Sequence, residues 1–227
     1  MSNPKDKAND PPETSAQGST VPKAVINRLS LYLREIHHLM LEGRETVSSS
    51  QLGNILGFTD AQVRKDLAYF GQFGYPGIGY RCLELIAEIR RILGTDRAWP
   101  VAIVGCGNMG RALLGYRGFE NQGFRVVAAF DSDPKKIGHT IGGLTIQPLA
   151  ELEQVLKARE IRLAILAVPA EAAQQVAEQL VAAGIDGILN FAPITLSLRR
   201  SVSTVGVDLA IELEQLSFAV VKRDKKS

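Results

Sequence analysis

The run Val101-Ala102-Ile103-Val104-Gly105-Cys106-Gly107-Asn108-Met109-Gly110 carries the most informative pattern in the chain. Its four apolar residues predict a buried strand, and the spacing Gly-x-Gly-x-x-Gly leads into a helix expected at 111–115. In such a loop the first glycine permits a tight turn, the second admits a pyrophosphate and the third lets helix and strand pack closely. Backbone N–H groups at the helix start would attract the phosphates. The run therefore predicts a dinucleotide-binding loop at residues 105–110.

The kind of dinucleotide is predicted from Asp131, which follows the next expected strand and lies 21 residues after Gly110. A carboxylate there can accept hydrogen bonds from both adenosine ribose hydroxyls and would repel a 2′-phosphate. Asp133 is near, and no arginine directly follows Asp131, so NAD(H) is favoured over NADP(H). Cys106 is interpreted as a small side chain that fits the turn, because nothing nearby would lower its pKa.

Apolar runs alternate with helical patterns through the rest of the C-terminal half. Strands are predicted at 101–104, 126–130, 144–147, 163–168, 188–191 and 202–205, and helices at 149–158 and 170–183. Short apolar strands that alternate with helices are typical of a parallel sheet covered on both faces. The fold class is therefore α/β, with a Rossmann-like domain at 96–207.

A last helix is predicted at 208–221, beyond the final strand. It places one apolar stripe on its surface, formed by Leu209, Leu213, Leu216 and Val220. Because the helix lies beyond the final strand with this stripe still to be buried, a partner subunit is expected. The basic residues at 222–227 are interpreted as a solvated tail.

The N-terminal part has a different organisation. Residues 1–20 have almost no large apolar side chain and are expected to be disordered. A long helix is predicted after Pro22, with apolar residues at helical spacing up to a stop at Gly43.

Two short helices are predicted next, each opened by a capping box: Ser48 with Gln51, and Thr59 with Gln62. Aromatic residues around a Pro-Gly turn at 73–80 predict a small hairpin, and a helical period returns at 81–93. Residues 21–95 therefore predict a winged helix-turn-helix, a DNA-binding fold.

The third helix would present the DNA-binding surface, with Val63, Leu67 and Phe70 turned inward. The side chains expected to reach phosphates or base edges are Gln62, Arg64, Lys65 and Tyr69, with Thr59 meeting a phosphate at the helix start. Pro76, Gly77 and Ile78 form the predicted wing, which could enter a minor groove. The alternative is a helix pair that binds only other proteins.

Composition narrows the choice of function. The net charge is +2, but residues 21–81 carry seven Lys/Arg against five Asp/Glu, so this part is the better candidate to face an anion. Two cysteines and three histidines without ligand spacing indicate neither a disulfide framework nor a metal site. No apolar stretch is long enough for a membrane span and no signal peptide is evident, so a cytoplasmic protein is expected.

An NAD-dependent oxidoreductase is the main rival interpretation. Hydride transfer to a carbonyl usually needs a positioned proton donor, and the sequence offers none: no histidine follows His139, and no Tyr-x-x-x-Lys is present. Residues 96–207 also leave no room for a substrate domain. We therefore expect a regulator, not an enzyme, and keep a CoA-binding module as a second alternative.

Four segments together resemble the Rex family of redox-sensing repressors: QVRKDLAYFGQFGYPGIGY (62–80), IVGCGNMGRALLGYRGF (103–119), ILNFAP (188–193) and VGVDLAIELEQLSF (205–218). The resemblance implies a winged helix followed by an NAD(H)-binding domain, in a homodimer that exchanges its C-terminal helices. It implies that NADH releases the protein from operator DNA, expected to be palindromic, while NAD⁺ competes.

The resemblance also implies roles for five residues. Arg28, Tyr116 and Asp208 look like the family's switch network, which joins domains and subunits, and Pro169 and Phe191 lie where the family places the nicotinamide. Without the resemblance, the first three would be interpreted as a surface arginine, a half-buried tyrosine and a helix-capping aspartate.

Overall fold

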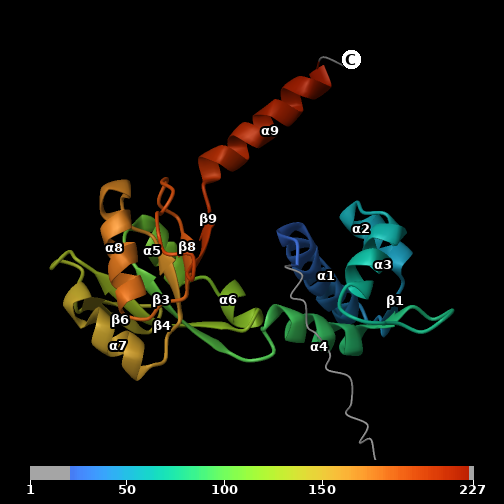
Figure 1. The fold of residues 1–227 in the computed structure, drawn as a ribbon, viewed down its shortest axis with the longest axis horizontal. Helices are drawn as coiled ribbons and strands as arrows, with labels where there is room; N and C mark the ends of the chain where they lie inside the picture. The colour runs from blue at the N-terminus through green and yellow to red at the C-terminus, as the bar shows by residue number, and fades with distance from the viewer. Residues whose placement is uncertain (1–20, 225–227) are drawn as a thin grey trace, which may run out of the picture. The chain divides into compact units, whose positions relative to one another are not determined.

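The computed structural model describes residues 21–224, so the predictions for residues 1–20 and 225–227 lie outside it (Figure 1). The chain forms two compact units that divide between Leu93 and Gly94.

The N-terminal unit is a small helical domain with a two-stranded sheet. Its helices are α1 (Lys23–Leu41), α2 (Ser49–Leu56), α3 (Asp60–Ala68) and α4 (Cys82–Leu93), and β1 (Thr46–Val47) pairs antiparallel with β2 (Tyr80–Arg81). Its core draws on every one of these helices, with Leu29, Tyr32, Leu33, Ile36, Leu52, Val63, Leu67 and Ile89 buried. This arrangement confirms the predicted helix-turn-helix at α2 and α3.

Capping chemistry explains how α2 and α3 begin. Ser48 and Gln51 form the predicted capping box, with a Gln51 N–H to Ser48 Oγ distance of 3.1 Å and a Ser48 N–H to Gln51 Oε1 distance of 2.8 Å. Thr59 caps α3 by accepting the Gln62 N–H at 3.1 Å. The second predicted box is wrong in one respect: the Gln62 side chain bonds to Asp66 instead of returning to the Thr59 backbone.

The predicted hairpin at 73–80 is reduced to one antiparallel bridge between Tyr75 and Gly79, with a turn between them. The following residues pair with β1, not with a second wing strand. Gly79 explains the close approach, because a Cβ there would lie 2.6 Å from the Val47 carbonyl oxygen. The turn nonetheless leaves Ile78 exposed at its tip.

The C-terminal unit confirms the Rossmann-like prediction. Within residues 21–224 its sheet has the order β5-β6-β4-β3-β7-β8-β9, and all pairs are parallel except β5 with β6 at one edge. The strands are β3 (Trp99–Val104), β4 (Phe124–Asp131), β5 (Thr140–Ile141), β6 (Leu144–Pro148), β7 (Leu163–Leu166), β8 (Gly187–Asn190) and β9 (Ser203–Gly206). The order reverses between β3 and β7, and ligands of open α/β sheets bind at such a switch point.

Helices cover the two faces of this sheet unequally. The helices are α5 (Asn108–Leu114), α6 (Gly118–Asn121), α7 (Leu152–Ala158), which follows a 3₁₀ turn at Leu149–Glu151, and α8 (Ala170–Ala182). One face packs fully against α7 and α8. Among the helices that the structure describes, the other face meets only α5 and the four-residue α6, and an apolar hollow of about 520 Å³ lies over it. The prediction of a sheet covered on both faces is therefore met only in part by the chain's own helices.

Helix α9 (Leu209–Asp224) follows β9 (Figure 1). Every side chain from Leu209 to Arg223 is exposed. The helix runs past the predicted end, so Lys222 and Arg223 belong to its last turn. Among residues 21–224, no helix is both long enough and apolar enough to cross a membrane.

Candidate functional site

The glycine loop at the carboxyl end of β3 shows why each glycine is needed. Gly105 has φ +95°, and a Cβ there would lie 2.4 Å from the Ala167 carbonyl oxygen. A Cβ on Gly110 would lie 1.8 Å from the Gly105 carbonyl oxygen, whereas one on Gly107 would meet nothing within 4 Å. The first and third glycines are thus required by packing, and the second leaves open space beside the backbone, as a pyrophosphate site needs.

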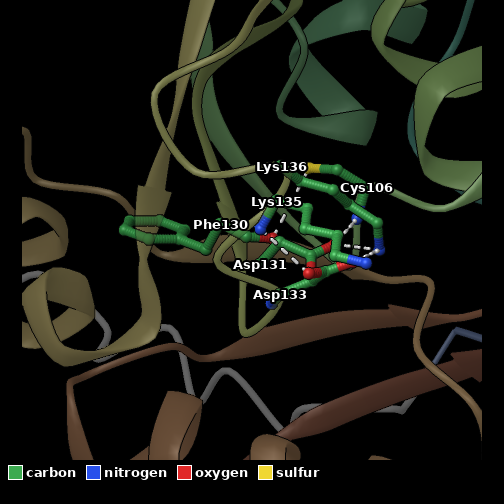
Figure 2. Close-up of polar contacts among 6 residues, drawn as sticks. All are labelled: Cys106, Phe130, Asp131, Asp133, Lys135 and Lys136. Carbon is green, nitrogen blue, oxygen red and sulfur yellow. Dashed lines mark hydrogen bonds and ion pairs between the residues drawn. The ribbon is translucent and has the colours of Figure 1, made fainter.

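Asp131 ties this loop to the end of β4 (Figure 2). Its Oδ2 accepts the Cys106 N–H at 2.7 Å and lies 3.0 Å from Lys136 Nζ, while Oδ1 accepts the Asp133 N–H at 2.8 Å. Burial alone would raise the pKa of Asp131, but these three donors outweigh it and hold the pKa below its ordinary value. The carboxylate is therefore ionised at neutral pH and fixes the loop.

This anchoring limits the role predicted for Asp131. An ionised carboxylate has about four acceptor positions, and three are used within the protein. Contact with the ribose hydroxyls stays a prediction, with one position left for it. Asp133, whose side chain is 40% exposed, is the more open carboxylate beside it.

Cys106 is fully buried within the loop, and its thiol faces the Phe130 carbonyl oxygen at 3.5 Å (Figure 2). Burial, aided by the negative charge of Asp131, raises the pKa of the thiol to about 11. A thiol that is neutral and shielded at physiological pH is a poor nucleophile. The structure thus supports the interpretation of Cys106 as a packing residue.

A cavity of about 450 Å³ gathers most of the predicted dinucleotide residues. Its lining includes Gly105, Gly107, Asn108, Met109, Asp131, Pro169 and Phe191. Cys106 and Gly110 are buried in the adjoining loop. Cavities of this size hold small molecules and parts of cofactors.

Sequence reasoning missed one residue that lines this cavity and one that fixes the turn beside it. Lys136, which also lines it, lies 3.0 Å from Asp131 and 3.8 Å from Asp133. Asn190 is buried, and its side chain bonds the backbone of Ala192 and Ile194, which fixes the turn that carries Phe191. The signal for Lys136 was its three-residue spacing from Asp133; Asn190 carried no comparable signal. Within the described residues, no group of three potential metal ligands is found.

The predicted DNA-binding residues lie on or beside α3 and the wing turn. Arg64 and Lys65 are exposed, and Arg64 pairs with Asp60 at 2.6 Å and Ser49 Oγ at 3.2 Å. Tyr69 is 44% exposed, with its ring centroid 5.4 Å from that of Phe70. Pro76, Gly77 and Ile78 are all exposed.

Asp66 is the main residue of this unit that sequence reasoning missed. It is 2% exposed, and its carboxylate accepts hydrogen bonds from Arg28, Tyr32 and Gln62. Its position shares the inward face with Val63 and Leu67, which marked it as unusual for a charged residue. Gln62 is consequently half-buried rather than fully turned outward.

The three residues assigned to the switch network lie in different local settings. Arg28 binds Asp66 within the N-terminal unit. Tyr116 is 59% exposed, and its ring meets Phe119 edge to face at 5.0 Å between centroids. Asp208 caps α9 by accepting the Ala210 N–H at 2.9 Å. Their joint role stays a prediction.

Comparisons with known proteins agree with this architecture. A family described as "CoA binding domain" matches residues 96–194, and one described as "Putative DNA-binding protein N-terminus" matches residues 20–68. The redox-sensing transcriptional repressor Rex of Carboxydothermus hydrogenoformans is 46% identical over 208 residues, which is 92% of this chain and 100% of that protein. The Rex of Chloroflexus aurantiacus is 45% identical over 90% of this chain and 96% of its own length.

Comparison with solved structures identifies relatives of the same kind. A crystal structure of RSP in complex with β-NAD⁺ and operator DNA has a TM-score of 0.85 and 35% identity, over 90% of this chain and 94% of that one. RSP in complex with β-NADH has a TM-score of 0.82 and 33% identity, over 91% and 97% of the two chains. The chain therefore belongs to the Rex family of redox-sensing transcriptional repressors.

Proposed function

We propose that this protein binds operator DNA through its winged helix and leaves the operator when its dinucleotide site holds NADH. The observation that carries the proposal is the glycine loop, whose second glycine leaves open space beside a cavity of about 450 Å³, in one chain with a helix-turn-helix. Relatives of the same architecture have been solved with NAD⁺ and operator DNA and with NADH.

The residues of the cavity fit a dinucleotide. The backbone around Gly107 would receive the pyrophosphate, and the carboxylates of Asp131 and Asp133 would face the adenosine ribose and disfavour a 2′-phosphate. Pro169 and Phe191 would contact the nicotinamide. NADH and NAD⁺ differ only in the charge and planarity of that ring, so discrimination must arise there. To lower operator occupancy from nearly full to nearly empty, NADH would have to bind the state that does not bind DNA roughly 10⁴-fold more tightly than the state that does.

The ligand acts here as a signal, not as a reactant. Val168, Ala172 and Val176 line the cavity near Pro169, and no histidine, tyrosine or cysteine belongs to its lining within the described residues. Lys136, which also lines the cavity, can donate a proton, but it is paired with Asp131 and Asp133, which are expected to face the adenosine ribose and not the nicotinamide. A cytoplasmic location, where NAD(H) and DNA are both present, suits this role.

On DNA, Arg64 and Lys65 would contact phosphates or base edges in the major groove, and the exposed wing turn would lie in a minor groove. A homodimer would place two recognition helices on half-sites about one helical turn apart, which requires a palindromic operator. A closed dimer that holds NADH would no longer match this spacing.

The test uses the full chain and a palindromic duplex that the protein enriches from random-sequence DNA. Fluorescence anisotropy of the labelled duplex should fall when NADH is added, and NAD⁺ should oppose this release. Equal release by both nucleotides would remove the sensing role. Steady consumption of NADH with a carbonyl substrate would favour an oxidoreductase, and tighter binding of CoA than of NADH would favour the CoA-binding alternative.

Asp208 gives a sharper test of the switch. Asp208→Asn keeps an N-cap side chain on α9 but removes the charge expected to engage Tyr116 or Arg28. Operator affinity should stay within about twofold, while the NADH concentration needed for release rises by roughly tenfold or more, as expected for a charge-assisted contact. Glu212→Gln, an exposed acidic residue in the first turn of the same helix, is the control. An unchanged NADH response in Asp208→Asn would exclude the residue from the switch.

A further inference from the structure

Asp66 connects the first helix of the DNA-binding unit to the recognition helix α3. Its Oδ2 accepts from Arg28 Nε at 2.5 Å and from the Tyr32 hydroxyl at 2.8 Å, and its Oδ1 accepts from Arg28 Nη2 at 2.8 Å and from Gln62 Nε2 at 2.7 Å. Arg28 and Tyr32 are one turn apart on α1, as are Gln62 and Asp66 on α3. All of the roughly four acceptor positions of the carboxylate are therefore used.

This arrangement suits an ionised carboxylate despite its burial. Burial alone would raise the pKa of Asp66, but the hydrogen bonds from Arg28, Tyr32 and Gln62 keep the pKa below its ordinary value. A planar guanidinium that binds both oxygens also fixes the direction of the carboxylate. The same contacts fix the rotation of α3 about its own axis. They therefore also fix the direction in which the outer side chains leave this helix.

The ionised state of Asp66 determines how the Gln62 amide is oriented. A carboxylate only accepts hydrogen bonds, so the amide nitrogen must face Asp66 and the amide oxygen must face away from it. Gln62 lies in the first turn of α3, and the N-terminal residues of a recognition helix are those that reach base edges. The outward Oε1 can accept from the N6 amino group of adenine or the N4 amino group of cytosine. This oxygen has nothing to offer the acceptors of guanine and thymine, while the second N–H of the amide can donate to N7 of the same adenine.

We propose that Asp66 is a positioning residue for base recognition, which orients Gln62 so that it selects adenine or cytosine, the bases with an amino group at the major-groove edge, at one position of each half-site. The inference rests on the proposed binding of operator DNA. It also explains why a buried charge lies on the inward face of α3, where an apolar residue would cost less to bury. Through its two bonds to Asp66, Arg28 also supports the recognition surface, apart from its predicted role in the switch.

The test is the ratio of Kd values for operator duplexes that differ by one base pair, scanned across the half-site for the full-length protein. Wild type should show one position with roughly tenfold preference for adenine or cytosine that depends on Gln62, as one base contact provides. Gln62→Ala should reduce that preference to about twofold or less. Asp66→Asn should reduce it at the same position, and the double variant should add little further loss.

A purely structural role for Asp66 gives a different result, because it would weaken binding to all duplexes alike and leave the ratio unchanged. An unchanged ratio in folded Asp66→Asn, or in Gln62→Ala, overturns the proposal. If Asp66→Asn does not fold, Tyr32→Phe takes its place: it keeps the ring but removes one of the two bonds on Oδ2, so the carboxylate holds Gln62 less firmly and the same ratio must fall. Failure of the wild type to prefer any duplex would instead contradict the proposed function.

Discussion

Gly110→Ala is expected to abolish NADH binding and to lower the free energy of unfolding of the C-terminal unit by about 2–3 kcal/mol, the cost of severe overpacking. The added Cβ would lie 1.8 Å from the Gly105 carbonyl oxygen, a backbone atom that cannot rotate away. The loop and α5 would have to separate, which would open the turn under the pyrophosphate. Trp99, the only tryptophan in the sequence, begins β3, so its fluorescence during urea unfolding reports on this unit.

Gly107→Ala is the matched control for this prediction. Its φ is −73° and its Cβ would meet nothing within 4 Å, so stability should change by less than about 0.5 kcal/mol. The new methyl would nonetheless occupy the space left for the pyrophosphate, and NADH affinity should fall roughly tenfold or more. Full NADH affinity in Gly107→Ala would mean that the phosphates bind elsewhere. Wild-type stability in Gly110→Ala would show that the loop relaxes without cost.

These glycines also show how far the sequence alone could lead. Their spacing after an apolar run predicted the loop, the strand before it and the helix after it, because each depends on local chain geometry. Asp131 was placed correctly at the end of β4, but its bonds to the Cys106 and Asp133 backbone required the folded turn. Local pattern therefore predicted the position of this residue and not its partners.

In the DNA-binding unit, the sequence predicted the helices but not the side-chain contacts between them. Gln62 has the spacing of a capping box with Thr59, yet its side chain bonds Asp66 because a buried carboxylate is the stronger acceptor. Nothing in α3 indicates that Arg28 and Tyr32 lie opposite Asp66, since they are 38 and 34 residues away from it in the sequence. The short β5 and α6 were missed for another reason: two and four residues are too few to show a period.

Removal of α9 should have the largest effect on DNA binding. This helix carries seven large apolar side chains that are 49–69% exposed. The predicted stripe that contains Leu213 and Leu216 lies on one side, and Ile211 and Phe218 lie on the roughly opposite side, given about 100° per residue. A helix that is apolar on two sides is normally buried between two surfaces. The apolar hollow of about 520 Å³ over the sheet is a further uncovered surface of the same unit.

A chain that ends after Val207 should therefore be monomeric by light scattering and should bind the palindromic duplex about a hundredfold more weakly, because the two half-sites are no longer held by one molecule. The double variant Leu213→Glu with Phe218→Glu should act in the same direction while retaining the helix. Ser217→Glu with Glu214→Gln, which changes neighbouring exposed positions without altering an apolar residue, should remain dimeric. Affinity for a single half-site should be equal in all of these proteins, since the winged helix is untouched. A dimer that survives loss of α9 would show that another surface joins the subunits, and the exposed apolar residues of α9 would then need a different partner.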